Sequence, residues 1–257
     1  MMLPIELTKI LYDSWEGQIS TSSQDSEIYG KCLNGPAKVT FKNGNRYEGN
    51  FYNGLLSGEG TFTWANGIVY TGEFTENRIT GKGNYKWPDS SSYEGEVKDG
   101  LRHGFGKYTV DEATYEGDWV EGKKEGKGKI IFKSGSIFEG YFKNDMKHGY
   151  GKMYYYPSGN YFEGEWRADV KCGMGTMNWT DIREKYVGNW KDNQQEGWGI
   201  HVWLESKGEG KFMRNRYEGN WKNGLRDGFG VFYYANGSRY EGYWSNNMKE
   251  GYSFYTD

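Results

Sequence analysis

Three histidines are the residues of this 257-residue chain best suited to bind a metal ion or to transfer protons near neutral pH. His103 and His148 each precede a Gly-x-Gly pair, and His201 alternates with Trp203 along an expected strand. None of them lies in a His-Glu-x-x-His pattern, and the chain contains no paired Cys-x-x-Cys and no Gly-x-Ser-x-Gly. We therefore expect structural roles for the histidines, with no catalytic residue, no metal site and no cofactor.

Glutamates recur between an aromatic residue and a glycine, and they could suggest paired-carboxylate catalysis. They are Glu48, Glu94, Glu116, Glu139, Glu163, Glu218 and Glu241. If each lies on its own hairpin of strands, successive carboxylates are about 10 Å apart, which is wide for a two-carboxylate site. Lys107, Lys129 and Lys152 fall on the same face. Cross-strand Glu–Lys pairs are the expected role of this ladder.

The Gly-x-Gly pairs could suggest phosphate-binding loops, but none is followed by Gly-Lys-Ser or Gly-Lys-Thr at the P-loop spacing. They belong instead to a repeated unit, and such a period decides the architecture. The unit begins at Tyr47, Tyr70, Tyr93, Tyr115, Phe138, Phe162, Tyr186, Tyr217 and Tyr240. One glycine stands two places after each start and another stands eleven places after it, at Gly49, Gly58, Gly72, Gly81, Gly95, Gly104, Gly117, Gly126, Gly140, Gly149, Gly164, Gly173, Gly188, Gly197, Gly219, Gly228, Gly242 and Gly251.

The unit has the period of β-strands. In Tyr-x-Gly-x-Trp the two aromatic residues and the glycine alternate with polar residues, so they share one face of a strand. Turn pairs such as Asn53-Gly54 and Asp99-Gly100 follow, and Asn-Gly or Asp-Gly is the strongest short-range signal for a hairpin. The sequence predicts an all-β chain, an elongated single-layer antiparallel meander of hairpins built from tandem units of about 23 residues.

Aromatic side chains on one face of such a sheet are the expected means of binding. A single layer leaves this face uncovered, and long exposed apolar strips mark interaction sites. The candidate partner-binding residues are Phe51, Trp64, Phe74, Trp87, Trp119, Trp166, Trp179, Trp190 and Trp203. We expect rings to cover the glycines, and we expect Tyr115 and Trp119 to lie against rings of adjacent hairpins rather than in a deep core.

The repeats also predict the domain organisation. Residues 1–28 are expected to form an N-terminal cap and loop with a degenerate copy of the unit, and residues 29–257 form an array of nine or ten units. One large insertion, at 204–215, lies in the second turn of its unit and is a candidate contact site. Cys32 and Cys172 are about six units apart, too far for a disulfide within one chain.

Composition argues against several classes of partner. The formal net charge is −3, and no block of like charge suggests a nucleic-acid-binding tail. No run approaches the roughly 20 apolar residues of a membrane span, and the N-terminal residues lack the pattern of a secretory signal. A cytoplasmic, reduced chain is the expectation.

The unit resembles the MORN repeat, in which Tyr-Glu-Gly-x-Trp precedes a His-Gly-x-Gly-like turn. The match runs from about Tyr47 to Gly251, and two copies carry even the histidine. Departures are Val97 in place of Phe or Trp, and Thr71 and Val187 in place of Glu.

The resemblance implies a non-catalytic scaffold. Arrays of this kind are similar to the MORN-repeat radial spoke head proteins of motile cilia, which implies axonemal and radial spoke partners, or a second copy of the chain, in the cytoskeleton of a cilium or flagellum. One alternative is a phospholipid-binding membrane tether of the junctophilin type, although the chain has no basic cluster to favour it. Another is the targeting half of a larger enzyme.

Overall fold

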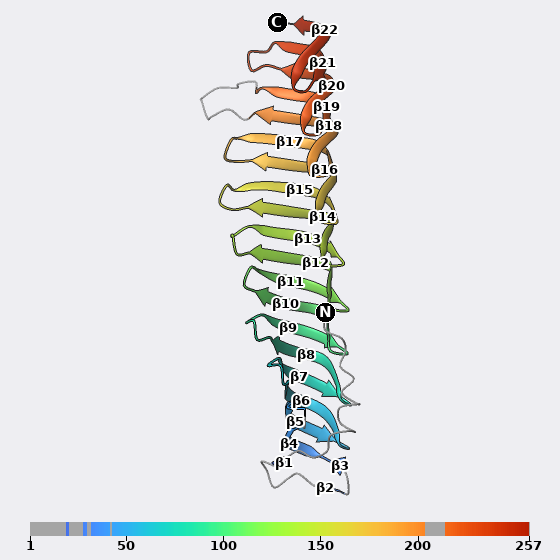
Figure 1. Cartoon of the computed structure of the whole chain (residues 1–257). Coiled ribbons are helices and arrows are strands. Elements are labelled where there is room, and N and C mark those ends of the chain that lie inside the picture. Colours follow the sequence, from blue (N-terminus) through green and yellow to red (C-terminus); the bar gives the residue numbers. More distant parts are fainter. Residues whose placement is uncertain (1–18, 21–27, 30–31, 42, 204–213, 257) are drawn as a thin grey trace. The chain divides into compact units, whose positions relative to one another are not determined.

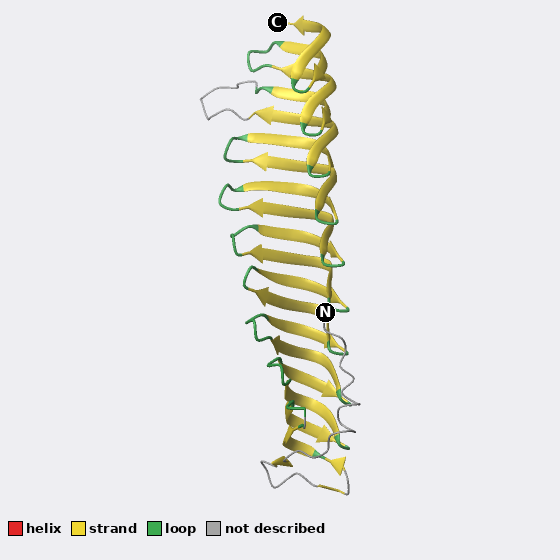
Figure 2. Cartoon of the chain, viewed as in Figure 1, coloured by secondary structure: helices red, strands yellow, loops and turns green. Residues whose placement is uncertain are grey.

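The computed structural model of the chain describes residues 19–20, 28–29, 32–41, 43–203 and 214–256. The described residues form strands and turns without a helix, and so contain no helix that could cross a membrane (Figure 2). The chain divides into two compact units, residues 1–126 and 127–257, and the boundary lies within strand β12. We call these units 1 and 2.

The strands follow the repeats in chain order (Figure 1). They are β1 (Ile19–Ser20), β2 (Ile28–Tyr29), β3 (Cys32–Leu33), β4 (Gly35–Thr40), β5 (Arg46–Tyr52), β6 (Leu55–Thr63), β7 (Val69–Thr75), β8 (Arg78–Lys86), β9 (Ser92–Lys98), β10 (Leu101–Val110), β11 (Ala113–Val120), β12 (Lys123–Phe132), β13 (Ile137–Lys143), β14 (Met146–Tyr155), β15 (Asn160–Arg167), β16 (Val170–Trp179), β17 (Glu184–Lys191), β18 (Gln194–Trp203), β19 (Arg216–Lys222), β20 (Leu225–Tyr233), β21 (Arg239–Ser245) and β22 (Met248–Thr256).

Consecutive strands pair with each other in both units. In unit 1, β4 to β11 form an antiparallel meander, with β1 paired to the outer side of β4. In unit 2, β13 to β22 form a second run with the same register. The predicted all-β meander of hairpins is confirmed. The N-terminal cap of residues 1–28 and the insertion at 204–215 lie almost entirely outside the described residues.

The first turn of each hairpin is a two-residue turn with positive φ at both residues, as in Asn53 (φ 50°) and Gly54 (φ 76°). This is the type I′ geometry that the Asn-Gly and Asp-Gly pairs predict. The turn also joins neighbouring repeats, because the N–H of its second residue donates to a carbonyl one repeat earlier, as from Asn77 to Leu56 at 3.1 Å. Where that residue is Asn or Asp, its side chain accepts a second bond in return, as Asn77 Oδ1 does from the Leu56 N–H at 2.8 Å.

Replacing Asn77 by Gly tests the contribution of this second bond. Glycine is the native residue at the equivalent positions Gly100 and Gly122, so the turn itself should form normally. The fully buried Leu56 would lose the acceptor of its N–H, and we expect the free energy of unfolding to fall by about 1–2 kcal/mol. Urea denaturation followed by tryptophan fluorescence measures it. An unchanged midpoint would show that the bond contributes nothing net.

Glycines occupy two structural positions. The first glycine of each sequence repeat pairs across the strands with the last glycine of a Gly-x-Gly pair. A row of glycines therefore runs across the strands, as in Gly49–Gly60–Gly72–Gly83. The first glycine of each pair, such as Gly58 (φ 71°), lies at a β-bulge where the register shifts. A left-handed conformation at a bulge favours glycine, which accounts for its presence in all nine copies.

Candidate functional site

The face of the sheet that carries the aromatic repeat residues, here called the inner face, is filled by rings that lie on the glycine row. A Cβ added at Gly106 would collide with the ring of Tyr93, and one at Gly151 would collide with the ring of Phe138. The tyrosine hydroxyls reach backbone carbonyls, as Tyr115 donates to the Asp118 carbonyl at 2.9 Å. Burial raises the pKa of Tyr93 to about 12, so its hydroxyl stays protonated at neutral pH. The expectation that rings cover the glycines is confirmed.

Tryptophans at the fifth position of the unit join successive repeats. The indole N–H of Trp119 donates to the carbonyl of Gly106 in the preceding repeat at 3.1 Å. The same bond recurs from Trp166, Trp190, Trp221 and Trp244. Trp119 also meets Tyr93 of the preceding hairpin and Tyr115 of its own strand edge to face, with ring centroids 5.6 and 5.1 Å apart. The predicted contact with a ring of an adjacent hairpin is confirmed for Trp119, but the expectation that Tyr115 and Trp119 lie outside a deep core is wrong, because both side chains are fully buried.

The expectation of an exposed aromatic strip on this face is wrong for most of the residues predicted to form it. The side chains that are buried in the chain's own core are Phe51, Trp64, Phe74, Trp119, Trp166 and Trp190. Burial follows from the glycine row, because a sheet without side chains along one row lets rings lie flat against its backbone. Trp87, Trp179 and Trp203, farther toward the second turns, are half-buried, and their role as partner contacts stays a prediction.

A cation stands among the rings of most repeats, nine places after the first residue of the repeat. These cations are Arg102, Lys124, Lys147, Lys171, Arg226 and Lys249, and each lies over at least one aromatic ring. Arg102, for example, lies 4.2 Å from the centroid of the Trp119 ring, a distance at which the ring quadrupole attracts a cation. The sequence reasoning missed this position, although a cation stands there in six of the nine repeats.

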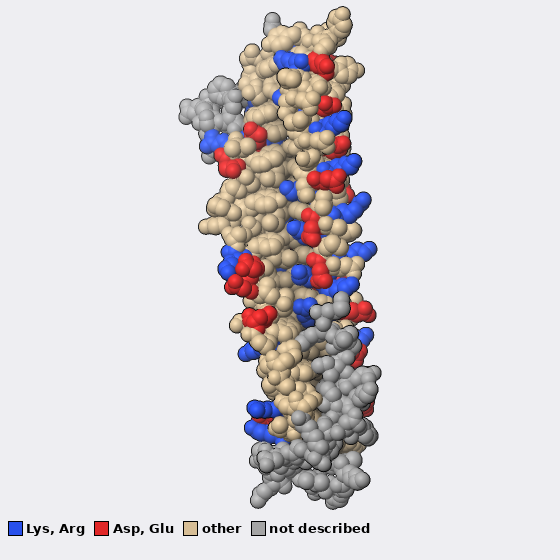
Figure 3. Space-filling model, in the orientation of Figure 1, with Lys and Arg blue, Asp and Glu red and all other residues tan. Residues whose placement is uncertain are grey.

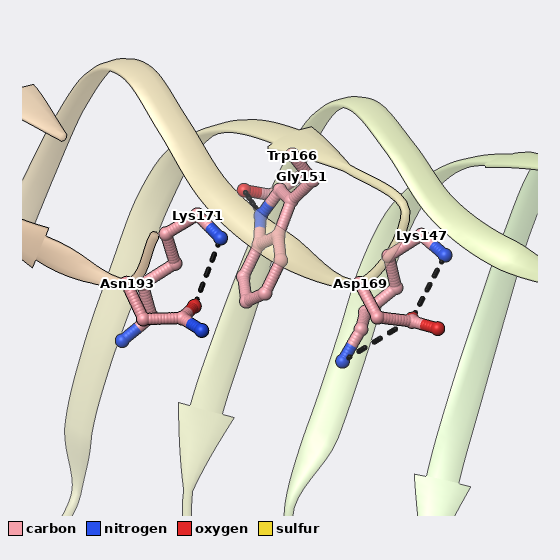
Figure 4. A network of polar contacts seen from close by, with 6 residues as sticks. All are labelled: Lys147, Gly151, Trp166, Asp169, Lys171 and Asn193. Atoms are coloured by element: carbon pink, nitrogen blue, oxygen red, sulfur yellow. Dashed lines mark hydrogen bonds and ion pairs between the residues drawn. The ribbon is translucent and has the colours of Figure 1, made fainter. Parts of the chain in front are cut away.

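Two neighbouring lysines at this position have different partners (Figure 4). Lys147 has a carboxylate beside it, with Nζ 3.7 Å from Asp169 Oδ1. The equivalent residue beside Lys171 is Asn193, whose Oδ1 accepts only the backbone N–H of Lys171, at 2.9 Å. Burial among Tyr155, Phe162 and Trp190, together with the positive charge of Lys147, lowers the pKa of Lys171 to about 8.

His201 is a core residue, as its alternation with Trp203 indicated. Its ring stacks between those of Trp179 and Trp203, and its Nε2 lies 2.8 Å from Glu184 Oε2. Burial lowers the pKa of His201 against the opposing effect of Glu184, so the imidazole is neutral at pH 7. Among the described residues, no group of three or more His, Cys, Asp or Glu side chains is placed to hold a metal ion.

The outer face of unit 1 carries charged side chains. The predicted Glu–Lys ladder is in register there, with Lys107 opposite both Glu94 and Glu116. These three side chains line a hollow of about 710 Å³ together with Glu59, Lys82 and Glu96 among others. Carboxylates outnumber cations in this set, so the outer face of unit 1 has an acidic character.

The outer face of unit 2 carries a row of large apolar side chains that the sequence reasoning missed. The row crosses unit 2. Its members stand at the middle residue of the Gly-x-Gly pairs and at the fourth residue of the sequence repeat. We call it the outer row and define it as Tyr141, Tyr150, Met174, Trp198, Phe229 and Tyr243. These residues are 43–59 % exposed. The signal in the sequence was the residue that follows the second repeat glycine, which is Glu or Lys in three of the first four repeats and apolar or aromatic in the last five.

Charges around the outer row are largely paired with each other. Lys152 lies 3.1 Å from Glu163, and Arg216 lies 3.0 Å from Glu218. The first of these is a pair of the predicted Glu–Lys ladder. Figure 3 shows one face of the chain, and over unit 2 the charged side chains on that face gather mainly toward the edge of the first turns.

Comparison of the sequence with models of known protein families identifies the repeat. The model of the MORN repeat matches residues 47–69, 70–92, 93–109, 115–137, 138–161, 162–181, 186–203, 217–239 and 240–256. Comparison with curated proteins finds no match. Among solved structures, the TCP domain of SAS-4 (dCPAP) from Drosophila melanogaster, in complex with a proline-rich motif of Ana2 (dSTIL), is 13 % identical, with a TM-score of 0.38 over 61 % of this chain and 85 % of that one. Nine tandem matches at the predicted starts cover most of the sequence, and the chain therefore belongs to the MORN-repeat family.

Proposed function

We propose that this chain is a non-catalytic scaffold and protein-interaction module, and that it works in the radial spoke head of a ciliary axoneme. MORN repeats in general act as non-catalytic modules for protein or lipid interaction. The observation that supports binding to a protein partner is the outer row. There, Tyr150, Met174 and Trp198 of successive repeats are each about half exposed. Apolar groups aligned on one face mark an interaction surface.

The axonemal location rests on the similarity of this repeat array to radial spoke head proteins. A membrane tether is less well supported, because several cations of the outer face are neutralised by carboxylates. Lys38 lies 2.7 Å from Glu48, and Lys152 is paired with Glu163. Attraction to an anionic membrane needs unpaired basic residues near its surface, each contributing about 1 kcal/mol.

Fractionation of isolated cilia tests the proposal. After the membrane is removed with a non-ionic detergent, we expect the tagged chain to stay in the axoneme pellet and to leave it only in chaotropic salt. Trp119→Ala is the control for a folded array, because it should weaken unit 1 and reduce retention. Release of the wild-type chain with the detergent, or its absence from cilia, would refute the axonemal location and favour the membrane tether.

A further inference from the structure

We propose that the outer row of unit 2 is a self-association surface, on which a second copy of this chain packs face to face about a two-fold axis. The inference deepens the proposed scaffold function by naming a partner. It is carried by the order of the side chains along the row, by their exposed area and by the paired charges around them.

Large and small side chains alternate along the middle of the outer row, from β14 to β20. Tyr150 on β14 lies opposite Glu165 on β15, Met174 on β16 lies opposite Asn189 on β17, and Trp198 on β18 lies opposite Asn220 on β19. From β14 to β20, large groups therefore recur every second strand, a period of about 9.6 Å. At the end of the row, Phe229 on β20 lies opposite a second large residue, Tyr243 on β21.

The smaller residues stay close to the sheet. Glu165 Oε1 accepts the Met174 N–H at 3.2 Å, and Asn220 donates to the Phe229 carbonyl at 3.1 Å. These bonds hold the smaller side chains against the backbone of the next strand and leave gaps between the large ones.

This alternation makes the row complementary to itself. A two-fold axis between β16 and β17 would place Met174 of one copy in the gap at Asn189 of the other. The same axis would place Trp198 in the gap at Glu165, and it would bring Tyr141 against Phe229. Each contact occurs twice, as in any isologous interface.

The area is sufficient for a specific dimer. Large side chains of this kind bury about 150–250 Å² each, so six that are half exposed offer roughly 600 Å² per copy. Two copies would bury about 1,200 Å², the lower limit of specific stable interfaces. The paired charges Lys152–Glu163 and Arg216–Glu218 let two identical faces approach without a net repulsion.

Sedimentation velocity of the purified full chain at chain concentrations from about 1 to 100 µM tests the proposal, with the wild type expected to form dimers. Trp198→Glu gives position 198 the residue type of Glu59, the same repeat position in unit 1, so the fold should tolerate it. We expect this variant to weaken dimerisation at least about 30-fold, as for a central interface residue. Phe105→Glu, the matched control, changes an exposed ring at the same repeat position in unit 1 and should leave the dimer intact.

A cysteine pair tests the register. In a Cys32→Ser/Cys172→Ser background, Trp198→Cys with Glu165→Cys should give a covalent dimer on oxidation. Within one chain the two positions are three strands apart, about 14 Å, beyond the reach of a disulfide.

Three outcomes would overturn the proposal: a wild-type chain that stays monomeric at 100 µM, a Trp198→Glu variant that dimerises as well as the wild type, or a dimer that fails to cross-link. Because these measurements use purified protein, a failure here is distinct from a failure of axonemal retention.

Discussion

Trp119→Ala should lower the free energy of unfolding of unit 1 by about 4 kcal/mol, the typical cost of removing a fully buried tryptophan. The side chain is 1 % exposed and meets Tyr93, Tyr108 and Tyr115 edge to face. The truncation would also leave the Gly106 carbonyl without its indole donor and would remove one of the two rings, those of Tyr108 and Trp119, over which Arg102 lies. Because repeats are stabilised mainly by their neighbours, loss of one such contact should uncouple the repeats on either side.

Urea denaturation followed by circular dichroism measures the loss, and limited proteolysis shows whether cleavage begins near β10 and β11. Trp119→Phe separates the two contributions, since it keeps a ring and removes the N–H, and it should cost less than the alanine variant. Trp198→Ala is the matched control, because its side chain is half exposed and should cost under about 1 kcal/mol. Equal losses in Trp119→Ala and Trp198→Ala would contradict the assignment of the inner face as the core.

The fold was predictable because the aromatic residue and the two glycines of the repeat recur nine times and hairpin turn signals lie between them. Alternation, Asn-Gly turns and constant spacing all indicate hairpins, and the structure places the strands as expected. The choice of exposed face was not predictable by the same reasoning. Alternation assigns Trp119 and Asp118 to opposite faces, but it does not tell which face the chain covers with its own rings.

That choice depends on tertiary contacts spread over two repeats. The glycine row admits the Tyr93 ring against Gly106, and the Trp119 indole completes the cover from the next repeat. A glycine in a strand signals close approach by another group, and here that group is a ring of the same chain. The inner tryptophans are therefore largely structural, and the outer row became visible only when burial on the two faces was compared.

Replacing Asn193 by Asp should raise the pKa of Lys171 by at least one unit from its native value of about 8. The change copies the native arrangement one repeat earlier, where Asp169 stands beside Lys147. Burial lowers the pKa of Lys171 below the ordinary lysine value of about 10.4, so between pH 8 and 10.4 the unfolded chain binds more protons than the folded chain. Stability of the native chain should therefore rise with pH across this window.

In the Asn193→Asp variant, the free energy of unfolding should rise much less with pH than in the native chain. At pH 7 it should exceed that of the native chain by about 1 kcal/mol, a value that allows for solvent screening of a partly exposed amine. Denaturation midpoints between pH 7 and 10 test this in a Cys172→Ser background, because burial raises the pKa of the Cys172 thiol and its ionisation would act in the opposite direction. The pH dependence of acetylation at Lys171, followed by mass spectrometry, gives the pKa directly. Lys171→Met should abolish the slope, and a slope that persists in this variant would assign the effect to another group.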